Sequence, residues 1–236
     1  MAEVRAIFSI TLLTAMWVTF PVTARSLEGR IEDRGTFVVS IAGKRVGTED
    51  FQIRSAHDVV EDEGAVTIRV QQAGQPVAFE TESDLVLNSH LWPKTYSWKQ
   101  TVPRFSALRI NFLVSPVTAR YRTLNGATDF REFLLPKNVV VLDDNVLSQY
   151  EILVWRYLQT PGGKQHFSAF IPQEALPGKV TVDEAAPQGA SIAGAKVNAR
   201  RFVVTTELTR IELWTNKVGN LERVSLPTIH LLAVRR

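Results

Sequence analysis

The chain has 236 residues, of which 45% are hydrophobic and 22% charged, a composition typical of a folded globular protein rather than a disordered one. The formal net charge of +3 is too small to indicate a nucleic-acid partner, and we expect none. The chain contains no cysteine, which excludes disulfides and a lipid anchor attached through cysteine.

The first 24 residues have the order of regions that is typical of a secretory signal peptide. Arg5 lies in a short polar start, an uncharged apolar run follows, and the small residues Val22 and Ala24 precede Arg25. An uncleaved membrane anchor is the alternative, because the apolar run is at the lower length limit for crossing a bilayer. We predict residues 1–24 as a signal peptide, residues 25–35 as a flexible lead-in and residues 36–236 as a single β-roll domain. The mature protein would then be soluble and periplasmic, or otherwise extracytoplasmic.

Alternating apolar and polar residues indicate strands along most of the remaining chain. Phe37, Val39 and Ile41 would share one face of the first strand, and Gly43-Lys44 would form the turn to the next. The pattern continues to the C-terminus through "HFSAFI", "KVTV", "RRFVVTT", "RIELWT", "LERVSL" and "HLLAVR". We predict a mainly antiparallel all-β fold of roughly a dozen strands or more. So many strands cannot stay flat, so we expect one large curled sheet, either a spiral β-roll or a half-barrel.

The stretch "LDDNVLSQYEILVWRYLQT" reads as one long helix over about 144–160. Asp144 is the expected N-cap, and the Thr-Pro-Gly-Gly run from Thr160 ends the helix. Ile152 and Trp155 lie opposite the main apolar face, so apolar side chains cover most of the circumference. Such a helix needs protein or an apolar ligand around it, and we expect the curled sheet to wrap around it.

This geometry predicts an apolar cavity between sheet and helix that binds a hydrophobic small molecule such as a lipid or acyl chain. The expected lining residues are Val146, Tyr150, Leu153, Val154, Tyr157, Trp98, Phe112 and Tyr121. Arg109, Arg120 and Arg122 are candidates for binding its headgroup, because guanidinium groups pair with phosphate or carboxylate. The alternative for these arginines is a solvated outer face of the sheet.

The chain carries no recognised catalytic motif, so we expect a protein that is not an enzyme, without cofactor or metal. The four histidines are scattered and lack the spacing of metal ligands. Residues 57–64, "HDVVEDEG", concentrate acidic side chains but lack the order of a calcium-binding loop. We interpret them as a solvated connection.

The helical stretch, together with "GGKQHFSAFIPQ", "GKVTV", "GKRVGTEDFQIR" and "IELWTNKVGNLERVSLP", resembles a family of uncharacterised bacterial secreted proteins. In that family a long antiparallel sheet rolls up as a spiral around a helix, similar in shape to periplasmic lipoprotein carriers. The positions that carry the resemblance are Asp143, Asn145, Tyr150, Tyr157, Pro172, Gln173 and Trp214. The resemblance implies a lipid or acyl chain as ligand and attaches no catalytic residue.

Two functions stay open. The first is an extracytoplasmic binding protein for a hydrophobic ligand held beside the helix. The second is a structural cell-envelope protein with a solid core, no small ligand and an envelope protein as partner. We expect a monomer in both cases. An apolar cavity adjoining residues 146–158 would favour the first, and a filled core would favour the second.

Overall fold

The computed structural model describes residues 29–72, 74–123, 126–186, 190–192, 195–197, 199–207 and 209–236. The predicted signal peptide lies outside these residues. The first strand, β1 (Arg30–Ile41), already begins within the segment that was expected to be a flexible lead-in, so that expectation is wrong from residue 30 onward. The alternation of apolar and polar residues does not reveal the start of this strand, because its residues are mostly polar. Asp33 is buried there and forms an ion pair with Arg235.

The first half of the chain forms eight consecutive strands. They are β1, β2 (Lys44–Ala56), β3 (Val59–Gln72), β4 (Gln75–Asn88), β5 (Pro93–Val102), β6 (Ser106–Asn111), β7 (Val117–Thr123) and β8 (Thr128–Phe133). The β1–β2 turn is Ala42-Gly43, one residue earlier than predicted, and both residues have positive φ, 48° and 75°. A two-residue hairpin turn of this kind matches the twist of the strands that it joins.

The second half begins with β9 (Val140–Val141) and α1 (Ser148–Gln159). It continues with β10 (Gln165–Ile171), β11 (Leu176–Ala185), β14 (Arg200–Thr205), β15 (Arg210–Thr215), β16 (Leu221–Leu226), the short 3₁₀ helix η1 (Pro227–Ile229) and β17 (Leu231–Arg235). Two short strands, β12 (Ala190–Ile192) and β13 (Ala195–Val197), pair with each other outside the main sheet.

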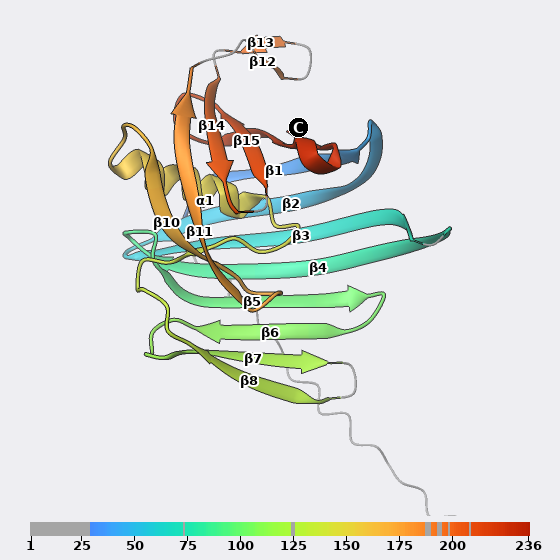
Figure 1. Ribbon diagram of the computed structural model, residues 1–236, viewed down its shortest axis with the longest axis vertical. Coiled ribbons are helices and arrows are strands. Elements are labelled where there is room, and N and C mark those ends of the chain that lie inside the picture. Colours follow the sequence, from blue (N-terminus) through green and yellow to red (C-terminus); the bar gives the residue numbers. More distant parts are fainter. Residues whose placement is uncertain are drawn as a thin grey trace, which may run out of the picture.

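The main sheet of the described residues has fifteen strands in the order β8-β7-β6-β5-β4-β3-β2-β1-β17-β16-β15-β14-β11-β10-β9 (Figure 1). Every neighbouring pair is antiparallel except β9 and β10, which are parallel. The first and last strands are therefore neighbours in the middle of the sheet. Two arms extend from this junction, an N-terminal arm of β1–β8 and a C-terminal arm of β17–β14, β11, β10 and β9.

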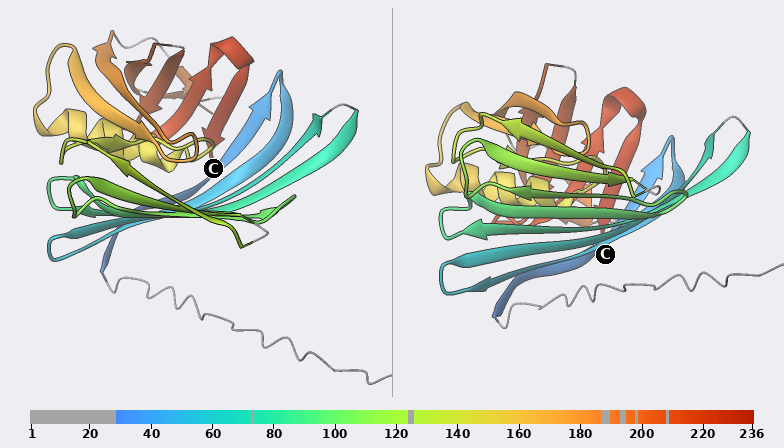
Figure 2. Two further views of the ribbon diagram at one scale, coloured as in Figure 1. Left: turned by 60° about the horizontal axis from the view of Figure 1, so that its bottom comes forward. Right: turned by 90° about the horizontal axis from the view of Figure 1, so that it is seen from below.

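The two arms curl toward each other, and α1 lies between them (Figure 2). Inward side chains of both arms form one apolar core with the helix, including Phe37 and Tyr96 from the N-terminal arm and Phe202 from the C-terminal arm. Near the ends of the arms, the ring of Phe170 in β10 lies 4.8 Å from that of Phe133 in β8. The predicted fold class, a large antiparallel sheet curled around one helix, is confirmed, and the sheet does not close into a barrel.

The helix is shorter than predicted, since it begins at Ser148 rather than near Asp144. The expected N-cap is wrong, because Leu147 occupies that position and its side chain makes no capping hydrogen bond. The predicted burial on several sides is confirmed, with Ile152 4% exposed and Leu153 1% exposed. Asp143, just before the helix, accepts hydrogen bonds from Tyr96 and Gln173. Asn145 adopts a left-handed conformation with φ 63°, which is not helical.

The turn between β15 and β16 packs directly on the C-terminal half of the helix. Gly219 in this turn has φ +100°, and a Cβ at this position would lie 2.7 Å from Cδ1 of Leu158 and 3.3 Å from Cδ1 of Trp155. Glycine is therefore required by both the backbone conformation and the close approach of the helix.

We predict that Gly219→Ala lowers the free energy of unfolding by about 1–3 kcal/mol, because the new methyl group is strained and overlaps the helix. Gly178→Ala is the matched control, since Gly178 lies in β11 with no atom within 4 Å of its added Cβ. Urea unfolding of both variants tests the difference. Equal effects of the two substitutions would contradict the described contact.

Candidate functional site

The eight residues predicted to line a cavity all lie in the interior. Of these, Trp98, Val146, Leu153, Val154 and Tyr157 are at most 7% exposed. The others, Phe112, Tyr121 and Tyr150, are half-buried and pack against the apolar core. The Tyr157 ring lies edge-on to Phe202 at 5.4 Å between ring centroids. Five of the eight, Val146 to Tyr157, thus belong to the helix or to the segment just before it. Of the other three, Phe112 and Tyr121 contact the C-terminal arm, at Phe170 and at Pro172.

The buried N-terminus of α1 is capped by a carboxylate from strand β2. The backbone N–H groups of Leu147 and Ser148 donate to Oε2 and Oε1 of Glu49 at 2.7 and 3.0 Å. Glu49 is fully buried, and this burial raises its pKa to about 7 although the two N–H groups oppose the shift. A carboxylate at a helix N-terminus satisfies free amides and interacts favourably with the helix dipole.

A second buried acid, Asp62 of β3, lies beside this cap. The Ser148 hydroxyl donates to Oδ2 of Asp62 at 3.1 Å, while Oδ1 has no hydrogen-bond partner among the described residues. Burial, and next the negative charge of Glu49, raise the pKa of Asp62 to about 8. Asp62 belongs to the stretch 57–64 that was interpreted as a solvated connection. That interpretation is wrong, because Val59 onward is strand β3 and Asp62 is 2% exposed.

Asp143 ties the segment before the helix to both arms. The Tyr96 hydroxyl of β5 donates to Oδ2 of Asp143 at 2.6 Å, and the backbone N–H of Gln173 donates to Oδ1 at 3.0 Å. Burial raises the pKa of Asp143 to about 6. Nearby, the Tyr121 hydroxyl of β7 donates to the carbonyl oxygen of Pro172 at 3.0 Å. Three positions that carried the family resemblance, Asp143, Pro172 and Gln173, therefore meet at one structural joint.

A third set of buried titratable groups connects the helix to the junction of the two arms. Glu151 accepts a hydrogen bond from the backbone N–H of Leu221 at 2.8 Å, and burial followed by the neighbouring Asp33 raises its pKa to about 10. Asp33 of β1 forms a two-pronged ion pair with Arg235 of β17, with one contact of 2.6 Å. Burial alone would raise the pKa of Asp33, but the Arg235 guanidinium holds it below its ordinary value.

These buried carboxyl groups hold the helix in place rather than facing a substrate. Each accepts hydrogen bonds from backbone or side-chain groups of another element, and each is almost completely enclosed. Their chemical capacity is to take up protons near neutral pH, which couples protonation to stability. None of them lines either of two hollows on the surface of the sheet.

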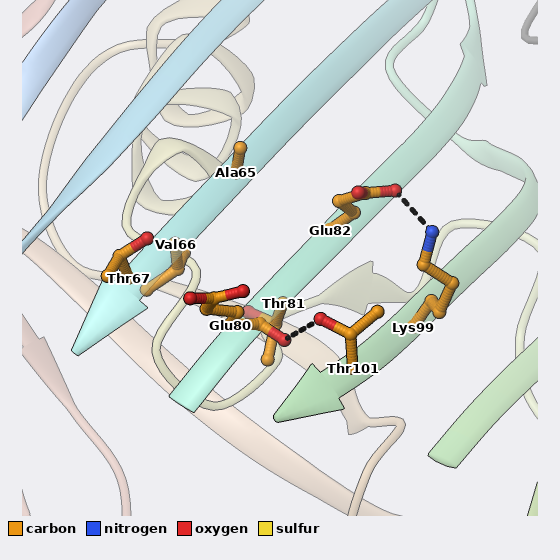
Figure 3. Close-up of a pocket in the computed structure, with 8 residues that line it drawn as sticks. All are labelled: Ala65, Val66, Thr67, Glu80, Thr81, Glu82, Lys99 and Thr101. Atoms are coloured by element: carbon orange, nitrogen blue, oxygen red, sulfur yellow. Dashed lines mark hydrogen bonds and ion pairs between the residues drawn. The ribbon is translucent and has the colours of Figure 1, made fainter. Parts of the chain in front are cut away.

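The smaller hollow lies on the outer face of the N-terminal arm and has a volume of about 170 Å³ (Figure 3). Its one lysine is already paired, since Nζ of Lys99 lies 2.8 Å from Oε2 of Glu82. Thr101 also donates to the carbonyl oxygen of Glu80 at 3.4 Å. This hollow is shallow and polar, and the cation in its described lining is already paired.

The larger hollow, about 650 Å³, is an open groove where two turns meet at one end of the sheet. We call it the end groove. Ala42 and Gly43 line it from the β1–β2 turn, and Arg223 and Ser225 from β16. Pro227, His230, Leu231 and Leu232 line it from η1 and β17. The N–H of Ala42 donates to the carbonyl oxygen of His230 at 3.0 Å and fixes one turn against the other.

Arg223 is the main polar group of the end groove. Its guanidinium lies 4.5 Å from the centroid of the Trp214 ring, and Arg201 lies over the same ring at 6.0 Å. Arg201 is paired with Glu212 at 2.8 Å, but Arg223 has no carboxylate partner among the described residues. The Nε of Arg223 is also buried without a hydrogen-bond acceptor in that part of the chain. A half-buried cation of this kind favours an anionic ligand.

The predicted headgroup arginines lie elsewhere. Arg109 and Arg120 are directly opposite each other on β6 and β7, and both are exposed on the outer face together with Arg122. The Arg120 guanidinium lies 5.7 Å from the centroid of the Phe130 ring. The structure therefore groups the three residues, but on a flat surface that adjoins neither hollow.

Sequence reasoning missed the end groove because its walls, for example Ala42 and Arg223, come from opposite ends of the chain. No pattern in the sequence singled out Arg223.

Within the described residues, no three His, Asp or Glu side chains are grouped as metal ligands would be. No helix in the described part of the chain is long and apolar enough to cross a membrane.

Comparison with known proteins assigns neither a family nor a function to the chain. No family model matches the chain, and no curated protein matches it. Among solved structures, the crystal structure of a DUF1089 family protein from Pseudomonas aeruginosa is similar, with 8% sequence identity and a TM-score of 0.46. The match covers 77% of this chain and 90% of that chain. At this identity and TM-score the likeness assigns no function.

We predict that Glu49→Ala lowers the free energy of unfolding by about 2–4 kcal/mol, because it leaves two buried helix amides without an acceptor. Glu80→Ala is the matched control, since Glu80 is exposed on strand β4 and should change stability by less than about 0.5 kcal/mol. Urea unfolding at one pH compares the two. A cost for Glu49→Ala no larger than that of the control would show that the cap is dispensable.

We also predict that the folded state loses stability as the pH rises from about 5 to about 8. The pKa values of Glu49, Asp62 and Asp143 are raised in the folded protein to about 7, 8 and 6. An acid with a raised pKa contributes its full stability below its unfolded pKa and loses it as the pH rises through the folded pKa. Chemical denaturation across this pH range measures the slope.

Asp62→Asn should flatten this pH dependence, because the substitution removes one of the groups that must stay protonated. Asp58→Asn, in the exposed turn before β3, is the control and should leave the slope unchanged. Stability that is constant or rises between pH 5 and 8 would refute the assignment.

Proposed function

We propose that the protein is a non-enzymatic binding protein for an anionic amphiphile, a molecule with a carboxylate or phosphate headgroup and an alkyl chain. The end groove is the proposed site. The observation that carries the proposal is Arg223, a half-buried guanidinium that lines the groove and has no carboxylate partner among the described residues. The ligand class is the hydrophobic one predicted from the sequence, but the proposed site is at one end of the sheet instead of in the interior.

The charge of Arg223 supports an anionic headgroup. Its guanidinium is held against the Trp214 ring, which limits the side-chain freedom that would be lost on binding. A planar guanidinium can donate two parallel hydrogen bonds to a carboxylate or phosphate. The Ser225 hydroxyl and the imidazole of His230 line the same groove and supply further hydrogen-bonding groups.

The size and walls of the groove support an alkyl chain. A volume of about 650 Å³ is within the range of about 300–1,000 Å³ that is usual for small-molecule sites. Pro227, Leu231 and Leu232 provide apolar wall next to the polar end. The groove therefore has a cationic end and an apolar wall, which match the headgroup and the alkyl chain of the proposed ligand.

The interior is a poorer location for the ligand. Leu153, Val154 and Tyr157, which were expected to line a cavity, are 1%, 0% and 0% exposed and pack against other side chains. The extracytoplasmic location and the likeness in shape to periplasmic lipoprotein carriers remain part of the proposal. They rest on residues 1–24 and on the sequence resemblance.

Isothermal titration with laurate, dodecyl phosphate and the neutral dodecyl maltoside tests the proposal. We expect the two anions to bind and Arg223→Gln to weaken them about tenfold to a hundredfold, the loss expected for one charge-assisted pair. Arg69→Gln, an exposed arginine on β3, is the control and should bind like the wild type.

Titration with inorganic phosphate shows whether the groove binds only the anionic headgroup or also the alkyl chain. Tighter binding of dodecyl phosphate than of phosphate, together with weakening by Leu232→Asp, supports the proposed use of the apolar wall. Three results would overturn the proposal: no binding of either anion, equal binding of dodecyl maltoside and laurate, or anion binding that Arg223→Gln leaves unchanged.

A further inference from the structure

Strand β8 is an unpaired edge of the main sheet. It is the outermost strand of the N-terminal arm and, among the described residues, pairs only with β7. Its first five residues, 128–132, are all exposed, and only Phe133 is partly buried, against Phe170. The opposite edge of the sheet, β9, has two residues and both are buried. The two edges are therefore not equivalent, and β8 is the accessible one.

An exposed edge strand offers backbone groups for pairing with another strand. In an antiparallel sheet, alternate residues of a strand point their N–H and C=O groups to opposite sides. Half of the backbone groups of β8 thus face away from β7. Soluble proteins commonly protect such an edge with charged side chains, and β8 carries Asp129, Arg131 and Glu132.

These charges favour one register for antiparallel pairing of β8 with a second copy of itself. A two-fold axis perpendicular to the sheet pairs residues that point to the same face of the sheet. Because neighbouring residues of a strand point to opposite faces, the axis must lie between two copies of one residue that are directly opposite each other. Centred on Asp129, Arg131 or Glu132, the pairing would place like charges directly opposite each other, which is destabilising. Centred on Phe130, it places Asp129 opposite Arg131 of the other copy, twice by symmetry.

The side chains at this centre support the same register. Phe130 is 70% exposed on the outer face, and its counterpart would lie directly opposite it. Arg131 already contacts Asp129 at 2.7 Å within one strand, so the two copies would form a network of four alternating charges. An aromatic pair and two opposite-charge pairs are the cross-strand contacts that stabilise sheets.

We infer that the chain forms a two-fold symmetric dimer in which β8 pairs with β8 of a second copy, centred on Phe130. The main sheet then continues across the axis from one copy to the other. This inference replaces the monomer expected from the sequence and is independent of the end groove, which lies where the β1–β2 turn meets η1.

Sedimentation velocity over a concentration series tests the dimer by charge reversal. The wild type should dimerise, and Arg131→Asp should raise the dimer dissociation constant about tenfold or more, because it places acidic residues opposite each other. The double variant Asp129→Arg with Arg131→Asp restores opposite charges in the same register and should recover dimerisation. A monomer at all concentrations, or a dimer that Arg131→Asp does not weaken, would overturn the inference.

Disulfide trapping tests the register itself, since the chain has no cysteine of its own. Phe130→Cys places two thiols opposite each other, with Cα atoms about 4.5–5.5 Å apart, within reach of a disulfide. Glu132→Cys is the control, because the two copies of residue 132 would lie four residues out of register, about 13 Å apart. Covalent dimer from Phe130→Cys alone supports the register. Equal cross-linking of both variants, or of neither, would refute it.

Discussion

A helix whose N-terminus is buried inside a sheet must find acceptors for its first backbone amides without help from water. In this protein the acceptor is Glu49, which reaches Leu147 and Ser148 from a strand about 100 residues earlier in the chain. Glu49 thereby satisfies two helix amides at a point that the curled sheet closes off from water. The cost is a carboxyl group in an apolar interior, with Asp62 beside it, and the raised pKa values follow from that burial.

The same solution recurs at the other contacts of the helix. Asp143 connects the segment before the helix to β5 and to the loop after β10, and Glu151 connects the helix to the start of β16. Through Asp33 and Arg235, the last of these contacts also reaches the place where the first and last strands meet. Hydrogen bonds from both arms therefore fix the position of the helix and of the segment before it. The proposed binding site lies away from the helix, at one end of the sheet.

The sequence predicted the parts of the fold that depend on local periodicity. Alternation such as that of Phe37, Val39 and Ile41 identified strands, and the apolar surface of the helix correctly required the sheet to wrap around it. Prediction failed where a polar residue is buried by a distant partner. Asp62 looked like part of a solvated loop, and Asp144 looked like an N-cap, because acidic residues have those roles when only their neighbours in sequence are considered.

The candidate site was harder to predict than the fold for the same reason. The end groove combines the β1–β2 turn with β16 and β17, and the importance of Arg223 lies in a missing partner, which only three-dimensional contacts reveal. Among the predicted lining residues, Leu153, Val154 and Tyr157 of the helix are at most 1% exposed, because other core side chains pack against them.

Hydrogen exchange of the backbone amides of Leu147 and Ser148 tests most directly whether the helix N-terminus is sealed and capped in the interior. We predict that both amides exchange only through global unfolding, as slowly as core amides of β14 such as that of Val204. Exchange of the two amides at rates typical of an exposed helix end, while Val204 stays protected, would contradict a buried and capped N-terminus.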